Sequence, residues 1–346
     1  LPLFLGKKPN QSSDFLVPWT AVSQSIIYVL YQIRLMKVAQ QLASTIMMVR
    51  PAHFGFNPET AENNAFQSNE GTLTVEQISA AAVEEFDAFV EKLRSFQINV
   101  IVIQDTESPL KTDAVFPNNW ISFHEDGLIL TYPMFSPNRR LERRREIIDK
   151  IGEEFEIKQW IKLENHEQGG KFLEATGSMV LDRSNQLAYA CRSIRTHPDL
   201  FEDFCQTMNF EPILFTAKDE EGSEIYHTNV MMAIGKELAI ICLESIGDQE
   251  ERAHVKQQLE QSGKEIIDLS FAQMNSFAGN MIEVKNAEGE NFLIMSSAAY
   301  HSLNMQQTER ILVHTAILHS SLEHIERYGG GSARCMIAEV FLPKRG

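Results

Sequence analysis

At residues 329–335 the chain carries the sequence GGGSARC, and an apolar run, MIAEVFL, follows at 336–342. Glycines adopt left-handed backbone angles without strain, so a helix readily ends at them and the chain can turn into a strand. The stretch therefore predicts a loop at the end of a sheet, with the thiol of Cys335 on that loop. Such a thiol can act as a nucleophile, although free cysteines are more often buried in a core. Other segments of the chain bear on this choice.

The composition is that of an ordinary globular protein, with 23% charged and 43% hydrophobic residues among 346. The formal net charge of -16 argues against nucleic acid or an acidic membrane surface as a partner, because both require a basic face. One basic cluster lies at residues 139–145, where arginines surround Glu142. We expect a solvated helix face there. The length allows two domains or one large domain built from repeats.

Four cysteines lie far apart in the sequence: Cys191, Cys205, Cys242 and Cys335. No pair has the Cys-x-x-Cys spacing, so the pattern indicates neither a zinc site nor a disulfide framework. A reducing compartment, the cytoplasm, is expected. A metal site made of histidines is disfavoured, because the candidates do not share one helical face: His301, His314, His319 and His324. The sequence leaves open whether the chain forms a homo-oligomer.

The first 35 residues differ from the rest, because no strong hydrophobic period runs through them. Their longest apolar stretch, Ile26–Tyr31, is far shorter than a membrane span, and no signal-peptide cleavage site follows it. We expect residues 1–35 to be an appendage that is poorly ordered or loosely docked. Residues 36–346 are expected to form a single α/β domain.

Apolar runs of strand length alternate with helical segments after residue 36. Such runs lie at 45–49, 98–103, 127–132, 212–215, 238–243 and 291–295. Helix signals lie between them, and the expected helices are 74–96, which opens with a capping box, one from Pro137, one from Pro198, 250–261 and 304–327. About five βα-type units of roughly 60 residues share this part of the chain, although no repeated motif accompanies the period.

Polar residues interrupt the apolar pattern in three further segments. They carry the sequences TDAVFPNNW at 112–120, GGKFLEATGS at 169–178 with CRSIRT at 191–196, and YHTNVMM at 226–232. An N-terminal stretch, MVRPAHFGFNP at 48–58, precedes them, and the Cys335 loop follows. Each motif is weak by itself, but their order along the chain is specific.

This ordered set resembles the guanidine-modifying superfamily, which includes arginine deiminase, dimethylarginine dimethylaminohydrolase and the amidinotransferases. The stretch 48–58 and the Asn119-Trp120 pair resemble its arginine-deiminase-related branch, which includes citrulline hydrolases. The resemblance extends over residues 49–342. It implies the pentein fold, a five-bladed α/β propeller with pseudo-fivefold symmetry and an active site on its axis. It also implies a cysteine–histidine–carboxylate site with no metal and no cofactor.

The resemblance implies a role for each candidate residue. Cys335 would be the nucleophile, His227 the general acid and base, and Glu174 the carboxylate that orients the imidazole. Asp113 would hold the α-amino group of the substrate. Arg195 would bind the α-carboxylate through two parallel hydrogen bonds. The alternatives are a core thiol, a histidine hydrogen-bonded after a strand and a surface glutamate.

The chain departs from the pattern at Asn118 and Asn119, where related enzymes carry carboxylates that face a guanidinium. A guanidinium has donors only, and burying it against neutral amides leaves its charge unpaired at a cost of about 3–5 kcal/mol. A ureido group is neutral and has an acceptor oxygen beside its N–H donors, so asparagine amides can complement it. The pair therefore favours citrulline over arginine. Alternatively, the asparagines only shape a turn, and a carboxylate elsewhere, such as Glu167, contacts the guanidine.

We therefore expect a cysteine-dependent hydrolase that cleaves the ureido C–N bond of citrulline, through a covalent thio-intermediate, to ornithine, carbon dioxide and ammonia. An arginine deiminase or dihydrolase is the first alternative, and an amidinotransferase is the second. A non-catalytic protein that binds arginine-like ligands is a third, disfavoured because such a protein has no use for an activated thiol. The expected partner is a small-molecule amino-acid substrate.

Overall fold

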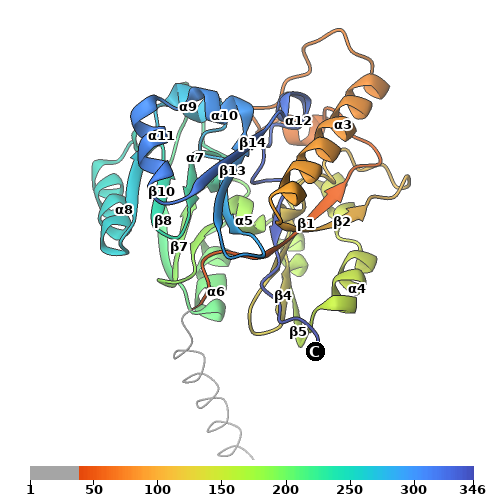
Figure 1. The fold of residues 1–346 in the computed structure, drawn as a ribbon, viewed down its shortest axis with the longest axis horizontal. Coiled ribbons are helices and arrows are strands. Elements are labelled where there is room, and N and C mark those ends of the chain that lie inside the picture. Colours follow the sequence, from red (N-terminus) through yellow and green to blue (C-terminus); the bar gives the residue numbers. More distant parts are fainter. Residues whose placement is uncertain (1–38) are drawn as a thin grey trace, which may run out of the picture. The chain divides into compact units, whose positions relative to one another are not determined.

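Five three-stranded sheets make up the framework of residues 39–346, which are the residues described by the structure, a computed structural model (Figure 1). The expectation for residues 1–35 falls outside this range. With hydrogen-bonded neighbours side by side, the sheets are β15 (Ala338–Glu339), β1 (Thr45–Arg50) and β2 (Asn99–Gln104); β3 (Ile121–Phe123), β4 (Leu128–Thr131) and β5 (Gln159–Lys162); β6 (Val180–Asp182), β7 (Leu187–Cys191) and β8 (Glu211–Phe215); β9 (Met232–Ile234), β10 (Leu238–Ile241) and β11 (Glu265–Asp268); and β12 (Ile282–Lys285), β13 (Asn291–Ser296) and β14 (Ala316–Ser320).

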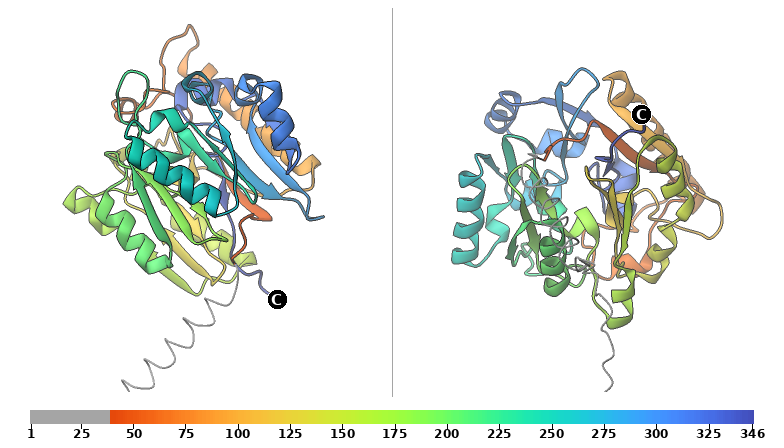
Figure 2. Two further views of the ribbon diagram at one scale, coloured as in Figure 1. Left: turned by 90° about the vertical axis from the view of Figure 1, so that its left-hand side faces the viewer. Right: turned by 90° about the horizontal axis from the view of Figure 1, so that it is seen from below.

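All five sheets have the same pattern of parallel and antiparallel strand pairing. The central strand pairs antiparallel with one neighbour and parallel with the other. A parallel pair requires a long crossover, and each crossover here carries at least one helix. The longer helices lie toward the outside and the strands toward the inside (Figure 2).

The helices vary in length from single turns to more than five turns. The α-helices are α2 (Pro58–Ala61), α3 (Val75–Ser95), α4 (Arg145–Glu154), α5 (Ala175–Ser178), α6 (Pro198–Met208), α7 (Thr228–Met231), α8 (Gln249–Gln261), α9 (Phe271–Asn275), α10 (Ser297–Ser302), α11 (Met305–Leu312) and α12 (Glu323–Gly329). The 3₁₀ helices are η1 (Pro117–Asn119), η2 (Pro137–Glu142), η3 (Glu164–Gly169) and η4 (Leu243–Ser245). None of the helices in residues 39–346 is long and apolar enough to cross a membrane.

The central strands are covered on both faces, which explains why the sequence shows four of them, β1, β4, β10 and β13, as apolar runs. All residues of β4, β7 and β10 are buried. Two outer strands of the parallel pairs, β5 and β11, are partly exposed and show no such run. The predicted capping box of α3 is present, because Thr74 and Gln77 each accept a hydrogen bond from the other's backbone N–H. The buried face of α3 carries Phe86 and Phe89, and it packs on the sheet of β1 and β2.

The expected helix over residues 304–327 is wrong. Asn304 and Gln307 do form a capping box, but α11 ends at Leu312, and the chain then forms β14 and α12. Residues 316–320 pair in parallel with β13, from Phe292↔Ala316 to Ser296↔Ser320. These strand hydrogen bonds outweigh the local helical pattern, because they complete a sheet whose other strands are buried.

The apolar run after Cys335 forms a strand over two residues only. β15 pairs antiparallel with β1, with Met47 opposite Ala338 and Ile46 opposite Glu339. Cys335 lies in the turn that precedes it, as the sequence predicts. The first sheet therefore combines strands from both ends of the described chain, and residues 40–346 form one compact unit.

Candidate active site

Five polar segments, each just before the antiparallel outer strand of one sheet, supply the residues of the candidate site. Asn119 precedes β3, Glu174 precedes β6, His227 precedes β9, Asn280 precedes β12, and Cys335 precedes β15. They meet because the five sheets present the same end of the same strand toward one place. Asn280 was not identified from the sequence. Its position before β12 is equivalent to the positions of the other four residues before their strands, and this equivalence becomes visible once the five units are aligned.

One cavity brings most of the predicted site residues together. Its lining residues are Thr60, Asn64, Asp113, Phe116, Asn119, Arg139, Arg195, Tyr226, His227, Gly329, Gly330, Gly331 and Cys335. Glu174 does not line the cavity but is hydrogen-bonded to His227 directly behind it. Asn118 is buried outside the lining, and its backbone carbonyl accepts a hydrogen bond from the Thr176 hydroxyl at 3.2 Å. Among residues 39–346, no group of three or more His, Cys, Asp or Glu is placed to hold a metal ion.

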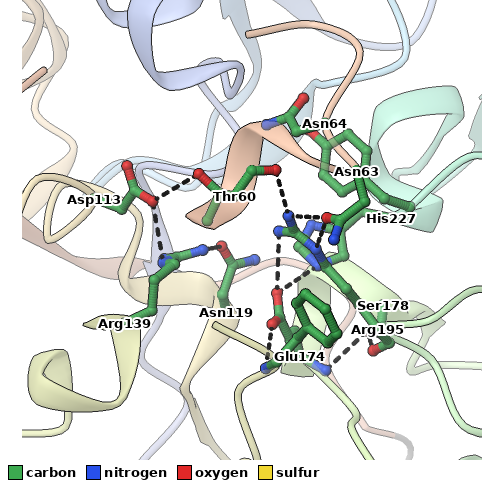
Figure 3. Close-up of polar contacts among 12 residues, drawn as sticks. Thr60, Asn63, Asn64, Asp113, Asn119, Arg139, Glu174, Ser178, Arg195 and His227 are labelled. Atoms are coloured by element: carbon green, nitrogen blue, oxygen red, sulfur yellow. Dashed lines mark hydrogen bonds and ion pairs between the residues drawn. The ribbon is translucent and has the colours of Figure 1, made fainter. Parts of the chain in front are cut away.

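Glu174 and His227 form a buried, hydrogen-bonded pair (Figure 3). Glu174 Oε2 lies 2.8 Å from His227 Nε2, and its Oε1 accepts a hydrogen bond from the backbone N–H of Phe135 at 2.9 Å. Burial would raise the pKa of Glu174, but the charge of Arg195 and the contact with His227 lower it to about 2. Burial lowers the pKa of His227 to about 4 despite that contact. Around neutral pH the pair is thus a carboxylate and a neutral imidazole. Because Nε2 is bonded to Glu174, Nδ1 is the imidazole nitrogen that can exchange a proton with a substrate.

Two asparagine amides point at the sulfur of Cys335. Asn280 Nδ2 lies 3.2 Å from Sγ, and Asn229 Nδ2 lies 3.5 Å from it. Asn280 Oδ1 also accepts hydrogen bonds from the backbone N–H groups of Arg334 and Cys335, so it holds the loop as well as the sulfur. The two amides and the loop contacts thus fix the position of the sulfur. Asn229 belongs to a motif quoted from the sequence, but its contact with the thiol was not expected.

The other cysteines have surroundings of a different kind. Burial raises the pKa of their thiols to about 12, which leaves them inert: Cys191, Cys205 and Cys242. Of the four cysteines, all within the described residues and all free, Cys335 is the one that lines the cavity.

Asp113 is a buried carboxylate with one oxygen available. Its Oδ2 accepts a hydrogen bond from Asn57 Nδ2 at 2.7 Å and lies 3.6 Å from Arg139 Nε. Its Oδ1 has no hydrogen-bond partner within residues 39–346. Burial raises the pKa of Asp113 above its usual value, against the opposing charge of Arg139. A cationic ammonium group is the kind of ligand that such an oxygen accepts.

Arg195 lies between the carboxylate of Glu174 and the segment that follows β1. Its Nη1 is 3.6 Å from Glu174 Oε2, its Nε donates to Asn63 Oδ1 at 2.8 Å, and its Nη2 donates to the Thr60 carbonyl at 3.1 Å. The guanidinium also lies over the ring of Tyr226, 4.9 Å from its centroid. A substrate carboxylate bound to Arg195 would therefore displace the oxygens of Asn63 and Thr60 that now accept its hydrogen bonds.

The expected solvated helix face at residues 139–145 is wrong for Arg139. The segment is divided between η2 and α4, and Arg139 is 3% exposed and lines the cavity. Burial opposes its charge, but Glu142 and Asp113 raise the pKa of Arg139, so it remains a cation. The sequence could not show this, because burial of an arginine depends on a tertiary partner for its charge.

Asn119 is held on one side of its amide only. Its Oδ1 accepts a hydrogen bond from Arg139 Nη1 at 2.8 Å, whereas its Nδ2 has no partner among residues 39–346. The amide of Asn118 has none on either atom. Glu167, the alternative carboxylate, is bonded to Arg143 and to the backbone N–H of Met134, and it does not line the cavity.

Gly177 makes the close approach of these groups feasible. A Cβ atom at this position would lie 2.3 Å from Asn119 Nδ2 and 2.9 Å from His227 Nδ1. Atoms do not approach so closely without displacement, so a glycine is required here for packing rather than for backbone angle.

Solved structures with the same fold include ArgZ, an arginine dihydrolase from the ornithine–ammonia cycle in Cyanobacteria, with a TM-score of 0.67 and 15% sequence identity over 86% of this chain. The match covers 41% of the ArgZ chain, but 99% of its separately solved N-terminal domain. AgrE, solved with L-arginine, gives a TM-score of 0.67 and 15% identity over 87% of this chain and 40% of its own. A dimethylarginine dimethylaminohydrolase with S-methyl-L-thiocitrulline gives 0.58 and 13%, over 86% of this chain and 99% of its own. Likenesses at such identities show the fold alone.

The solved ArgZ and dimethylarginine dimethylaminohydrolase thus share their fold with this chain, whose cavity is lined by a cysteine and by a histidine that is bonded to a glutamate behind it. The chain belongs to the family described as eukaryotic N,N dimethylarginine dimethylhydrolase, whose model matches residues 50–342. The expected superfamily is confirmed by this match, and the activity in the family's description belongs to the expected class, the hydrolases of non-peptide C–N bonds. No curated protein matches the chain in sequence.

Proposed function

We propose that the protein is a cysteine-dependent arginine dihydrolase, which converts arginine and two molecules of water to ornithine, carbon dioxide and two molecules of ammonia. The observation that carries this proposal is the single cavity with Cys335 and His227 beside Asp113 and Arg195. Thiol and imidazole suit attack on a guanidino or ureido carbon, while a carboxylate and a guanidinium suit the two charged groups of a free amino acid. The known activity of ArgZ and the arginine complex of AgrE support this choice of substrate.

The proposed first hydrolysis acts on the guanidino carbon. The Cys335 thiol gives up its proton to His227 Nδ1 as its sulfur forms a bond to this carbon. The bond to one terminal nitrogen then breaks as Nδ1 delivers that proton to the departing ammonia. Water then loses a proton to the same nitrogen and attacks the carbon, the C–S bond breaks, and citrulline remains. Glu174 keeps the proton on Nε2 during both steps.

The proposed second hydrolysis repeats this chemistry on the ureido carbon of citrulline. Attack by the sulfur and departure of the δ-amine as ornithine leave an S-carbamoyl group on Cys335. Water releases carbamate, which breaks down to carbon dioxide and ammonia. The amides of Asn229 and Asn280 stabilise the sulfur whenever it leaves as a thiolate.

A second candidate is a hydrolase of citrulline alone, in which only the second hydrolysis occurs. Asn118 and Asn119 favour it, because both are buried amides and neither supplies the negative charge that a guanidinium requires. Glu174, an anion beside the imidazole, favours the dihydrolase instead.

Incubation of the purified protein with arginine, citrulline, agmatine and dimethylarginine tests these proposals when ammonia, ornithine, citrulline and dimethylamine are measured separately. A dihydrolase gives two molecules of ammonia per ornithine from arginine. A citrulline hydrolase gives ornithine from citrulline and no product from arginine. Dimethylamine release would instead identify a dimethylargininase, and no turnover of any substrate would overturn the proposed function.

We further propose that the five sheets are the blades of an α/β propeller and that residues 36–346 form one catalytic domain. The identical strand directions of the five sheets support the propeller, as does the contribution of one site segment by each sheet. In an experimental structure the five units should superpose by equal rotations about one axis through the cavity.

A further inference from the structure

We infer that Glu326 is a positioning residue for the nucleophile, because it holds the side chain of Ser332, where the turn that carries Cys335 begins. The inference rests on the role of Cys335 in the proposed function. Glu326 does not line the cavity of Cys335, and it would act through the backbone of the turn without touching the substrate.

The glycine run before Cys335 requires contacts from outside to fix its path. Gly330 has a left-handed φ of 63° where α12 ends. At Gly331 a Cβ atom would lie 2.9 Å from the ring of Phe116 and 3.2 Å from Cys335 Cβ, so a larger residue does not fit. Glycine has more backbone freedom than any other residue. The position of the thiol therefore depends on bonds to neighbouring elements.

Glu326 bonds to this run at two points. Its backbone carbonyl accepts a hydrogen bond from the N–H of Gly330 at 2.9 Å, and its Oε1 accepts one from the Ser332 hydroxyl at 2.6 Å. The Ser332 carbonyl in turn accepts hydrogen bonds from the N–H groups of Cys335 at 3.0 Å and Met336 at 3.3 Å. Glu326 and Ser332 are both buried, so little water competes for these contacts. One carboxyl group thus connects α12 to the turn that carries the thiol.

The helix that carries Glu326 is itself fixed. α12 packs against α3 (Figure 1). The side chain of Glu85, in α3, accepts hydrogen bonds from the backbone N–H groups of His324 at 2.9 Å and Ile325 at 3.1 Å. These N–H groups belong to the first turn of α12, where a helix offers them no partner of its own. Glu326 is therefore held in place on the side away from Ser332.

A carboxyl group is an expensive choice for this buried position. Burial raises the pKa of Glu326 to about 7, with Glu85 and Glu323 adding to the rise and the hydroxyls of Ser296 and Ser332 opposing it. None of these neighbours is a cation. An apolar side chain would fill the space at a lower cost in stability, because no polar group would then be removed from water. Residues that break such a packing rule are expected at functional positions.

The test combines kcat and KM with hydrogen exchange of the peptide that carries the N–H groups of Cys335 and Met336. At pH 6 Glu326 is mainly the neutral acid, which glutamine copies in shape and in hydrogen-bonding groups. Glu326→Met and Ser332→Ala should each lower kcat by about tenfold, with KM within about twofold, and speed exchange in the turn by about tenfold. Glu326→Gln should keep all three values within about twofold, because its amide oxygen still accepts from Ser332.

Two further variants complete the design. The double variant of Glu326→Met and Ser332→Ala should be no slower than either single variant, because both remove the same hydrogen bond. Glu323→Met is the matched control, since Glu323 lies one turn earlier on α12 and is exposed. It should leave kcat, KM and the exchange of the turn unchanged.

Wild-type kcat and exchange in Glu326→Met and Ser332→Ala would overturn the inference. A rise in KM at constant kcat would also overturn it, by assigning Glu326 to substrate binding, and so would a Glu326→Gln protein as slow as Glu326→Met. If Glu326→Met does not fold by circular dichroism, Ser332→Ala decides, because it deletes the same hydrogen bond from the other partner. A wild-type protein without turnover would refute the proposed function, whereas hydrogen exchange would still show whether Glu326 holds the turn.

Discussion

Replacing Glu174 with glutamine changes the partner of His227 while keeping the size of the side chain. Glu174 receives two hydrogen bonds, from the backbone N–H of Phe135 at 2.9 Å and from His227 Nε2 at 2.8 Å. The Phe135 N–H is fixed as a donor, so the amide oxygen of glutamine has to face it. The NH₂ group then faces Nε2, and two donors would meet there. The imidazole relieves this contact by moving its proton to Nδ1, which can no longer accept a proton.

The expected loss in kcat is about 10³- to 10⁴-fold, the size seen when the carboxylate of a catalytic triad becomes an amide. That loss corresponds to about 4–5.5 kcal/mol of transition-state stabilisation. Arg195 Nη1 lies 3.6 Å from Glu174 Oε2 and would lose an anionic neighbour in the buried site, so a stability loss of up to about 3 kcal/mol is also expected.

The assay is ammonia release at saturating substrate, with the melting temperature measured in parallel. Glu164→Gln serves as the control, because Glu164 accepts a hydrogen bond from the Thr131 hydroxyl at 2.7 Å and does not line the cavity. The control should keep kcat within about twofold. A fall of less than about tenfold in a folded Glu174→Gln protein would refute the assignment of Glu174 as the residue that orients His227.

Four other changes have definite expected outcomes. Cys335→Ser should abolish product formation, by at least about 10³-fold, with an unchanged circular dichroism spectrum, and near wild-type turnover would end the covalent mechanism. Gly177→Ala would place a methyl group 2.3 Å from Asn119 Nδ2, so kcat should fall at least about tenfold, and normal kinetics would show that this part of the site can yield. Glu326 is buried, which raises its pKa to about 7 from 4.5, so its stabilising contribution is complete below pH 4.5 and is lost as the pH rises through 7. Relative to wild type, Glu326→Gln should therefore gain up to about 3 kcal/mol of unfolding free energy between pH 4 and pH 8 in urea titrations, and a constant difference would contradict the burial of a titrating carboxyl. Removal of residues 1–35 should leave kcat and melting temperature unchanged, since no hydrophobic period there offers a face for burial, and a clear drop in either would show that the segment is docked.

The sequence was sufficient to predict four of the five central strands, β1, β4, β10 and β13, because strands covered on both faces appear as continuous apolar runs, but it missed β7. Of the outer strands it indicated β2 and β8 only, and β14 was taken for part of a helix. That strand exists through its pairing with β13, a contact that no local pattern encodes.

Some residues of the candidate site could likewise be predicted from the sequence, and others could not. The sequence indicated Cys335, His227 and Glu174 because their neighbours form motifs in a specific order, and the structure places the first two at one cavity with the third bonded to His227. Asn280 escaped because it lies in no such motif. Arg139 escaped because an arginine-rich stretch usually faces solvent, and its contacts with Glu142 and Asp113 are what make burial feasible.

The pairing of β15 with β1 also bears on the order in which the parts of the site are synthesised. β1 precedes the other four sheets in the chain and β15 follows them all, so during synthesis the first sheet stays incomplete until the rest of the framework has left the ribosome. Cys335 arrives just before β15, at a stage when the segments that carry Asn119, Glu174, His227 and Asn280 are already present. The order of the strands thus places the nucleophile last in the chain, after all the segments that surround it.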